Sequence, residues 1–599
     1  MSDISISLEE KEIKLADLYL AKTLWPFIRP YSFQLCLTTL LVFIVTFFEL
    51  IMPILIQRAF DGFILPVGPE KGVHIFGLEI NSFSTFCILF SGVILVSFVI
   101  DFFQSLFMEY TGQTIVLNLR CRLFSHMAFL PVTFYDKNSS GRLVSRVAGD
   151  IENMNEMFTS VLIFIFRDLF LMIGILVILF SIDIKLALYL TAMVPVIVVS
   201  IALFSKILRK AFRTIRQKIA EINHNFSEAI TGIKIIQTTS SRNRFMEKFK
   251  LLNFEYFSAS LFQIRIFSIF MPFIGFMGVL SVAIILWTGS FNVIDKTLTL
   301  GELIAFLSYM KLFFRPLRDL SETFNLLQNA LASAERIINI LKNEKAKQRT
   351  SLNRMRIEKI SHISFDKVNF SYTRDKAVLK NITFDLPQNR SIGIVGRTGS
   401  GKSSIINLIT GFYQPENGII FFNDIDQQSI NIEDIRKRTA LVMQDPVLFS
   451  GSIRENIKPS EMDMDPARLE KALHDANCDF LFEKFSGLDT EIEEEGRPLS
   501  SGEKQLVCIA RAFAFDPDLI IFDEATSYMD SNSEQKVHDA MKKLMKGRLS
   551  IIIAHRLSTV RECDSILLLR DGTILEQGSH HELIGLKGEY YHLLEKEKI

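Results

Sequence analysis

Long apolar stretches in the first half of the chain constrain its fold more than any other feature. A helix of about 20 apolar residues crosses the hydrocarbon core of a bilayer and satisfies its own backbone hydrogen bonds there. About six such stretches occur, at residues 33–56, 82–104, 157–181, 184–206, 266–288 and 297–318. The sequence therefore predicts an all-α, six-helix transmembrane domain over residues 33–338, preceded by a charged cytoplasmic segment, 1–32.

The distribution of basic residues predicts the orientation of these helices. Lys and Arg concentrate in two long connections, around Arg142 and around Arg213. Cytoplasmic connections of membrane proteins carry this excess. We therefore expect a multi-pass protein of a bacterial inner (plasma) membrane, with both termini in the cytoplasm. The totals of 66 basic and 66 acidic residues give no indication of nucleic-acid binding.

Several charged residues fall at membrane depth, namely Glu49, Asp101, Arg167, Asp168 and Lys311. Charges in this position are costly in lipid, so they face a cavity, pair with each other or lie near water. A polar substrate pathway and structural pairing between helices both remain open. Adjacent residues of a helix point about 100° apart, so Asp168 is a poor partner for Arg167. Glu49, on another helix, is the candidate counter-ion.

The second half of the chain has a different pattern. Residues 339–362 are charged and poor in apolar side chains, which predicts a linker. From residue 363, short β-type runs alternate with helical segments, as in α/β domains. We therefore expect an α/β nucleotide-binding domain over residues 363–599.

The segment SIGIVGRTGSGKS, residues 391–403, is the strongest motif in this domain. It fits G-x-x-x-x-G-K-[ST] between a strand-like and a helical stretch, which is typical of a phosphate-binding P-loop. Its glycines let backbone N–H groups and the helix N-terminus face phosphate oxygens. We expect Lys402 to reach the β- and γ-phosphates of ATP and Ser403 to ligate Mg²⁺. The candidate binding residues are Gly396, Arg397, Thr398, Gly399, Ser400, Gly401, Lys402, Ser403 and Ser404.

The segment LIIFDEATS predicts the acidic part of the same site. Residues 519–522 are apolar and predict a buried strand that ends in Asp523 and Glu524. A carboxylate at this position, beside a P-loop, is placed to hold the water shell of Mg²⁺. The next carboxylate can orient or deprotonate the attacking water. We therefore expect Asp523 to serve the metal and Glu524 to be catalytic.

Further motifs resemble those of ATP-binding-cassette (ABC) proteins. PLSSGEKQLVCIARAF is similar to the family's L-S-G-G-Q signature, with Ser501 and Glu503 in place of Gly and Gln. The resemblance implies that Ser500 and Gly502 contact nucleotide held by a second cassette. It also implies a P-loop NTPase fold with a helical subdomain. The implied site residues are Tyr372 for adenine stacking, Gln444 for nucleotide and metal, Asp530 in the D-loop and His555 as the catalytic switch histidine.

The membrane half resembles type IV exporters of the multidrug and lipid-flippase branch. The segments FYDKNSSGRLVSRVAGDIENM, FSEAITGIKIIQ and FRPLRDLSETFNLLQNALASAERI carry this likeness. The resemblance implies ATP-driven export of an amphipathic drug-like molecule or lipid by a dimer with a second half-transporter. Homodimer and heterodimer remain open. The alternatives are a flippase for lipid or lipid-linked saccharide and, in another class, an ATP-gated channel or regulator.

Overall fold

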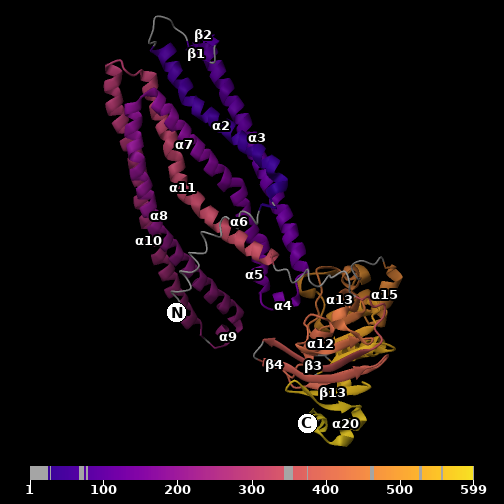
Figure 1. Ribbon diagram of the computed structural model, residues 1–599. Coiled ribbons are helices and arrows are strands. Elements are labelled where there is room, and N and C mark those ends of the chain that lie inside the picture. Colours follow the sequence, from indigo (N-terminus) through magenta and orange to yellow (C-terminus); the bar gives the residue numbers. More distant parts are fainter. Residues whose placement is uncertain are drawn as a thin grey trace. The chain divides into compact units, whose positions relative to one another are not determined.

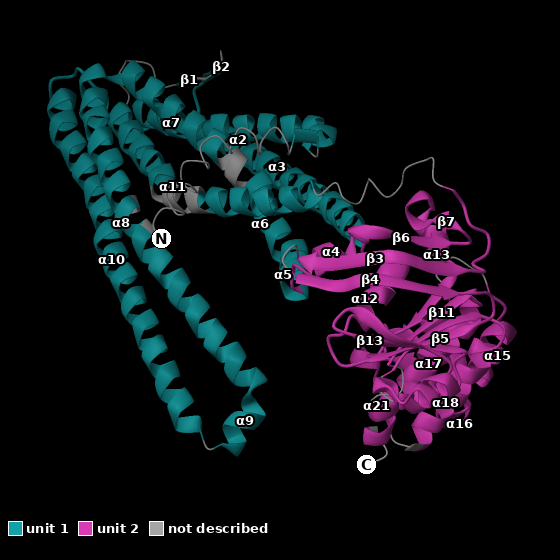
Figure 2. Ribbon diagram, turned by 60° about the horizontal axis from the view of Figure 1, so that its bottom comes forward, with its two compact units in different colours: residues 1–128, 140–342 teal, residues 129–139, 343–599 magenta. Residues whose placement is uncertain are grey.

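The computed structural model describes residues 25–26, 28–65, 73–75, 78–239, 241–342, 355–373, 376–458, 464–524, 529, 531–554 and 557–597. The chain divides into two compact units, coloured separately in Figure 2. Unit 1 comprises residues 1–128 and 140–342, and unit 2 comprises residues 129–139 and 343–599. The domain boundaries expected from sequence, at 32/33, 338/339 and 362/363, stay predictions.

Unit 1 is built from long helices (Figure 1). Five of them are long and apolar enough to cross a membrane, judged by length and composition. These five are α2 (Ser32–Ala59), α3 (Phe83–Ala128), α7 (Leu162–Ile182), α8 (Ile184–Thr231) and α10 (Arg242–Ile294). A helical transmembrane region is therefore confirmed for the first half of the chain.

The sixth expected span, 297–318, lies in helix α11 (Leu300–Leu341). This helix packs against α2, α7 and α10 in the same bundle. Glu302, Lys311 and Arg315 lower the hydropathy of its apolar half, which is why α11 is not among the five. The remaining helices of unit 1 are short: α5 (Ser140–Ser145), α6 (Ile151–Glu156) and α9 (Ile233–Thr238).

Two local features of unit 1 concern its connections. Asp183 alone separates α7 from α8, and its Oδ1 accepts a hydrogen bond from the Leu186 N–H at 3.0 Å. This N-cap starts α8 directly after α7 and so produces a tight hairpin between the two helices. Strands β1 (Val73–Ile75) and β2 (Leu78–Ile80) pair antiparallel between α2 and α3. The strand pair is an addition to the all-α domain that the sequence predicts.

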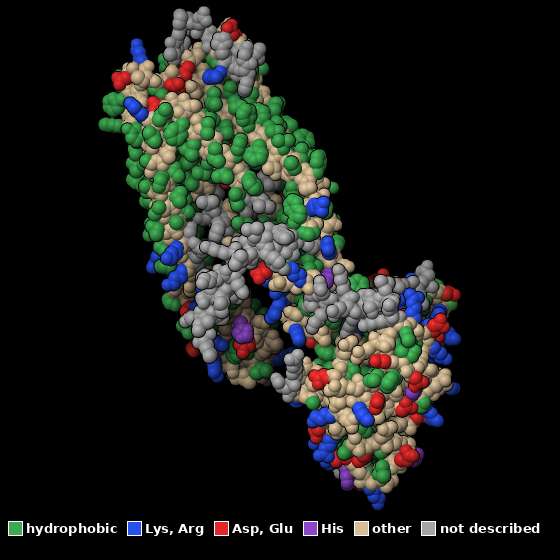
Figure 3. All heavy atoms as spheres, in the orientation of Figure 1, with side chains coloured by type: hydrophobic (Ala, Val, Ile, Leu, Met, Phe, Trp, Pro, Cys, Tyr) green, Lys and Arg blue, Asp and Glu red, His purple; other side chains and the backbone are tan. Residues whose placement is uncertain are grey.

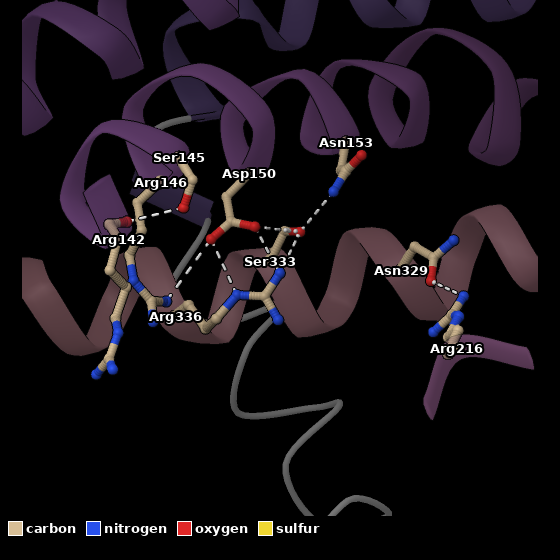
Figure 4. A network of polar contacts seen from close by, with 9 residues as sticks. All are labelled: Arg142, Ser145, Arg146, Asp150, Asn153, Arg216, Asn329, Ser333 and Arg336. Atoms are coloured by element: carbon tan, nitrogen blue, oxygen red, sulfur yellow. Dashed lines mark hydrogen bonds and ion pairs between the residues drawn. The ribbon is translucent and has the colours of Figure 1, made fainter. Parts of the chain in front are cut away.

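A polar network joins the region of α5 and α6 to α11 (Figure 4). Asp150, between α5 and α6, accepts hydrogen bonds from Arg336 Nε at 2.9 Å and from Arg336 Nη2 at 2.5 Å. Ser333 Oγ donates to the same carboxylate at 3.1 Å, and Arg146 lies 3.6 Å away. Burial alone would raise the pKa of Asp150, but these donors and charges outweigh it and lower the pKa. The network thus holds a charged carboxylate against α11.

Unit 2 contains a six-stranded sheet in the order β14-β13-β5-β12-β11-β8. Strand β14 pairs antiparallel with β13, and the other neighbours are parallel. The strands are β5 (Ser391–Gly396), β8 (Thr439–Val442), β11 (Leu519–Asp523), β12 (Leu549–Ile553), β13 (Ser565–Arg570) and β14 (Thr573–Gly578). This confirms the predicted α/β domain.

The alternation of side chains along these strands divides the interior of unit 2 into two cores. In β11, Leu519 and Ile521 enter one core, whereas Ile520 and Phe522 enter the other. Successive side chains of a strand point to opposite faces, so a central strand buried on both faces is continuously apolar. The first core also contains α12 (Lys402–Ile409), and the second contains α17 (Ser501–Phe515). The P-loop helix and the signature helix therefore belong to different cores.

The other elements of unit 2 surround this sheet. A four-stranded antiparallel sheet has the order β4-β3-β6-β7. Its strands are β3 (Ile363–Thr373), β4 (Lys376–Leu386), β6 (Asn417–Phe422) and β7 (Ile425–Asp426), and β9 (Gly451–Ser452) pairs with β10 (Glu491–Ile492). The helices are α13 (Ile432–Arg436), α14 (Ile453–Ile457), α15 (Pro466–Asp475), α16 (Phe480–Lys484), α18 (Ser531–Met545), α19 (Leu557–Val560), α20 (His580–Leu586) and α21 (Glu589–Glu597).

Residues 129–139 come from the membrane half of the sequence but are part of compact unit 2. They contain the short helix α4 (Val132–Tyr135). The Tyr413 hydroxyl, after α12, donates a hydrogen bond to the Asp136 carboxylate. Burial and this bond raise the pKa of Tyr413. The segment therefore has a direct polar contact with the nucleotide-binding half of the chain.

Candidate nucleotide site

The P-loop connects a central strand to a buried helix. Strand β5 lies between β12 and β13, and five of its six residues are buried. The loop that follows leads directly into α12, whose Ile405, Ile406, Leu408 and Ile409 fill the first core. Packing on both sides thus holds the loop and the N-terminus of α12 at the edge of the sheet. This strand–loop–helix arrangement is the one that the motif predicts.

Two positions of the loop have room only for glycine, which lets the backbone curl closely against its neighbours. Gly401 has φ +102°, and a Cβ there would lie 2.5 Å from Leu379 Cδ2. A Cβ on Gly396 would collide with the backbone oxygen of Leu569. The Ser400 hydroxyl is buried and has no hydrogen-bond partner among the described residues. A cradle without side chains and an unsatisfied buried hydroxyl fit a bound phosphate chain.

The Lys402 ammonium lies inside this loop. Its Nζ donates hydrogen bonds to the Gly396 carbonyl at 2.8 Å and the Arg397 carbonyl at 3.2 Å. The residue is 6% exposed, and burial lowers the pKa of Lys402, although the charges of Glu524 and Asp523 act in the opposite direction. The loop therefore positions a buried cation within the electrostatic reach of both carboxylates.

Asp523 and Glu524 follow the buried residues of β11. Asp523 pairs in register with Ile553 of β12, and the Glu524 N–H donates to the Ile553 carbonyl at 3.0 Å. Glu524 has φ +48°, a conformation that costs about 1–3 kcal/mol for a residue with a side chain. A backbone conformation of this cost persists only where the surrounding structure holds the residue in place. The two carboxylates are the acidic groups that the sequence predicts for this site.

A cleft beside the P-loop offers space for the base and ribose of a nucleotide. It has a volume of about 490 Å³ and is lined by Tyr372, Lys376, Val378, Gly399 and Asp571, among others. Tyr372 is 45% exposed. Its hydroxyl lies 3.1 Å from Ser404 Oγ and accepts from Asn407 Nδ2 at 2.9 Å. Two residues of α12 therefore fix an exposed aromatic face next to the P-loop.

The signature segment forms the N-terminus of α17. Ser500 is the N-cap, and its Oγ accepts from the Glu503 N–H at 3.3 Å, while Glu503 Oε2 accepts from the Ser500 N–H at 2.8 Å. Glu503, which stands in place of the consensus Gln, thus completes a capping box. A Cβ on Gly502 would lie 2.6 Å from Ser533 Cβ. Within the described residues, no hydrogen bond joins this segment to the P-loop of the same chain.

For the remaining candidate residues the structure gives only their exposure, or does not describe them. Arg397, Thr398 and Ser403 are exposed at the P-loop, and Gln444 is exposed after β8. Asp530 and His555 lie outside the described residues. The sequence predicts Ser403, Gln444 and Asp523 as ligands of Mg²⁺. All three carry side-chain oxygen atoms, which are the ligands that Mg²⁺ prefers.

Sequence reasoning missed Tyr413. Its ring makes edge contacts with Phe370 at 5.5 Å and with Tyr372 at 4.9 Å between centroids. Together with its bond to Asp136, these contacts link the aromatic wall of the cleft to residues 129–139. The available signal was the GFYQP segment directly after the P-loop helix, which places an aromatic pair at its end.

At membrane depth, the structure pairs Arg167 with Glu49. The distance from Arg167 Nη2 to Glu49 Oε1 is 2.5 Å, and the two side chains are 20% and 24% exposed. The predicted counter-ion of Arg167 is therefore confirmed. Arg167 Nε and Glu49 Oε2 have no hydrogen-bond partner among the described residues.

Comparison with known proteins agrees with both halves of the chain. Residues 35–317 match the family described as ABC transporter transmembrane region, and residues 379–527 match the family described as ABC transporter. The uncharacterized ABC transporter ATP-binding protein YknV of Bacillus subtilis is 32% identical over 95% of this chain and 93% of its own length. The "Probable multidrug resistance ABC transporter ATP-binding/permease protein YheH" of the same organism is 31% identical over 87% and 78%.

A third relative bears a different functional name. The ATP-dependent lipid A-core flippase of Chromohalobacter salexigens is 32% identical over 82% of this chain and 84% of its own length. Each relative matches across both the membrane half and the nucleotide half. The chain therefore belongs to the ABC transporters: it is a multi-pass membrane half-transporter whose C-terminal cassette binds and hydrolyses ATP to drive export, and which works as a dimer.

Proposed function

We propose that this half-transporter exports an amphipathic molecule, drug-like or lipid, out of a bacterial inner membrane, with both termini in the cytoplasm. The observation that carries the proposal is a site that combines the buried Lys402 with the half-buried Asp523 and Glu524 beside a glycine-containing loop. Relatives named as multidrug resistance or multidrug export proteins and as lipid A-core flippases support both export and the substrate class. Impermeant thiol labelling of Arg142→Cys and Lys71→Cys in intact cells tests the orientation, because only position 71 should react.

The P-loop residues hold the nucleotide in this proposal. Lys402 exchanges its two carbonyl partners for the β- and γ-phosphates, and the Ser400 hydroxyl donates to a phosphate oxygen. Ser403, Gln444 and Asp523 hold Mg²⁺, which neutralises phosphate charge. The exposed face of Tyr372 stacks on adenine.

Glu524 acts as the general base or water-orienting group, with His555 as its catalytic partner. We expect Glu524→Gln to bind ATP with unchanged affinity and to lose hydrolysis by about 10²–10⁴-fold, because the amide keeps the shape and loses basicity. Steady-state turnover by the purified dimer measures this. Turnover near the wild-type rate, in a preparation free of other ATPases, would sink the assignment.

The second nucleotide contact comes from Ser500 and Gly502 of a partner subunit. The capping box at Ser500 leaves the hydroxyl hydrogen free to donate, and α17 directs its N-terminus outward from the second core. The family resemblance also assigns Asp530, in the D-loop, to this interface. Homodimer and heterodimer are distinguished by purifying the chain alone: ATPase activity of a homogeneous dimer supports the first, and inactivity until a second half-transporter is added supports the second.

A lipid or lipid-linked-saccharide flippase is the second candidate within this class. The relatives named as lipid A-core flippases favour it. A panel of drug-like cations, phospholipids and lipid-linked saccharides, scored for ATPase stimulation in vesicles, separates the two functions. An ATP-gated channel is disfavoured because Lys402, Asp523 and Glu524 are all retained.

A further inference from the structure

A groove of about 990 Å³ lies between α8 and α10, away from the nucleotide site. The two helices run side by side along their length (Figure 1). The lining of the groove comes from one face of each helix, because its residues recur at intervals of four. They include Lys206, Lys210 and Thr214 in α8 and Phe254, Ser258 and Phe262 in α10. The groove therefore runs between one face of α8 and one face of α10, two helices that lie side by side in opposite directions.

The groove begins where the apolar part of α8 ends. The apolar stretch runs to Phe204, and Lys206 follows two residues later, about 3 Å along the helix axis. From Lys206 to Thr214 the helix rises about 12 Å. The headgroup layer beyond the hydrocarbon core is about 5–8 Å thick. Figure 3 shows Lys and Arg side chains where the apolar surface of unit 1 ends. The upper half of the groove thus lies at headgroup depth.

The charge of the groove is positive. Lys206 and Lys210 have neither an ion pair nor a side-chain hydrogen bond within the described parts of the chain. Glu255 is the one acidic residue in the lining, and its carboxylate accepts from Lys218 at 2.7 Å. Lys218 also donates to Glu221 at 2.9 Å. Glu255 is therefore already neutralised, and two ammonium groups remain to attract an anion.

The lining is otherwise largely apolar. Ile207, Phe254 and Phe262 are 48%, 65% and 49% exposed, and Ala211 and Ala259 form a narrow floor. Thr214 and Ser258 use their hydroxyls to donate to backbone carbonyls of their own helices. Exposed aromatic and aliphatic side chains next to lysines suit a ligand with an anionic head and a hydrocarbon tail.

We propose that this groove binds one anionic phospholipid from the adjacent leaflet. Its phosphate lies between Lys206 and Lys210, and the first part of an acyl chain lies against Ile207 and Phe262. Basic pockets between membrane helices recognise anionic headgroups in this way. The proposal does not depend on which substrate is exported.

The test compares lipid binding by the purified, full-length dimer and by Lys206→Ala/Lys210→Ala. Native mass spectrometry in detergent measures binding of dioleoylphosphatidylglycerol, with dioleoylphosphatidylcholine as the zwitterionic probe. A lysine near an anionic surface contributes about five-fold to affinity, so the double variant should lose about 25-fold for phosphatidylglycerol and little for phosphatidylcholine. Equal phosphatidylglycerol affinity in both proteins would overturn the proposal.

Matched variants separate a local site from a general effect of charge. Lys248→Ala/Lys250→Ala removes two exposed lysines of α10 outside the groove and should keep wild-type phosphatidylglycerol affinity. Lys206→Arg/Lys210→Arg keeps both positive charges and should also keep the wild-type affinity for phosphatidylglycerol. If the alanine variant aggregates, Lys206→Gln/Lys210→Gln replaces it as the variant without charge, and the arginine variant is its folded comparison. An equal loss in the Lys248/Lys250 control contradicts a local site.

Accessibility distinguishes the lipid from other occupants. Lys206→Cys, in a protein without its native cysteines, should react with a thiol reagent in lipid-free detergent and become protected when phosphatidylglycerol is added. Protection without lipid means that the second copy of the chain covers the groove, and protection by inorganic phosphate alone means a simple anion site. Either outcome overturns the proposal.

Discussion

The Arg167–Glu49 pair offers the most direct test of how the transmembrane helices are held together. Its closest atoms are 2.5 Å apart, and about four fifths of each side chain is buried. Removing one partner from a fully buried pair costs about 3–5 kcal/mol, because the other charge is left without compensation. Since both side chains retain some exposure, we expect Arg167→Ala to lower stability by about 2–3 kcal/mol. For a domain of this size that corresponds to a decrease in Tm of roughly 3–5 °C.

Intrinsic fluorescence measures this effect in the membrane half alone. The chain has 2 tryptophans, Trp25 and Trp287, and both precede the linker. Thermal melts of the purified protein in detergent, followed by tryptophan emission, therefore report on unit 1. The exposed Asp101 provides a control, because Asp101→Ala removes a charge at membrane depth that has no ion pair among the described residues. Its melting temperature should stay close to that of the wild type.

A double-mutant cycle decides between structural pairing and a role in cargo transport. Glu49→Arg/Arg167→Glu reverses both charges and should recover most of the lost stability, which gives a coupling energy of at least about 1 kcal/mol. If the pair serves cargo instead, Arg167→Ala should change ligand-stimulated ATPase while the melt is unaffected. A normal melt together with normal responses to every ligand would refute both interpretations of Arg167.

Three further predictions follow from the cassette and its connections. Lys402→Ala should weaken ATP binding, measured by titration with a fluorescent nucleotide, and unchanged affinity would contradict the P-loop assignment. Because Arg336 lowers the pKa of Asp150 below its ordinary 3.8, this carboxylate stabilises the fold above that pH and the contribution disappears as the pH falls through the lowered value. Tryptophan melts between pH 7 and 3 should therefore show a steeper acid loss for the wild type than for Asp150→Asn, and parallel curves would exclude the effect. Tyr413→Phe keeps the ring and removes the bond to Asp136, which is worth about 1 kcal/mol at this partly exposed position. It should preserve ATP affinity and reduce ligand-stimulated ATPase several-fold, whereas unchanged stimulation would show that this bond carries no coupling.

The sequence predicted the P-loop well because its chemistry is local. The spacing of glycines before Lys402 determines the backbone path, and the flanking strand and helix fix where the loop opens. The acidic end of β11 follows from the same kind of local pattern. The positive φ of Glu524 did not follow, since it depends on packing between β11 and β12 that a linear pattern does not contain.

Of two contacts between residues that are distant in the sequence, one can be predicted from the sequence and the other cannot. The sequence predicts the pairing of Arg167 with Glu49 because an unpaired charge at membrane depth is costly and few partners exist there. The bond between Tyr413 and Asp136 joins residues 277 positions apart in an exposed region, where water is an acceptable alternative partner. No energetic penalty pointed to it, so only the structure could assign residues 129–139 to the compact unit of the cassette.

The length of α10 has a mechanical consequence. Its 53 residues give a rod of about 80 Å, of which a bilayer core takes about 30 Å. The remaining length, about 50 Å, is braced by α8 along its side, so the two helices resist bending together. A rotation of about 5° at membrane level displaces the far end, near α9, by about 4 Å. The helix pair therefore acts as a lever: a slight tilt in the membrane becomes a movement at the far end as large as a side chain. The force available at that end is smaller in the same proportion.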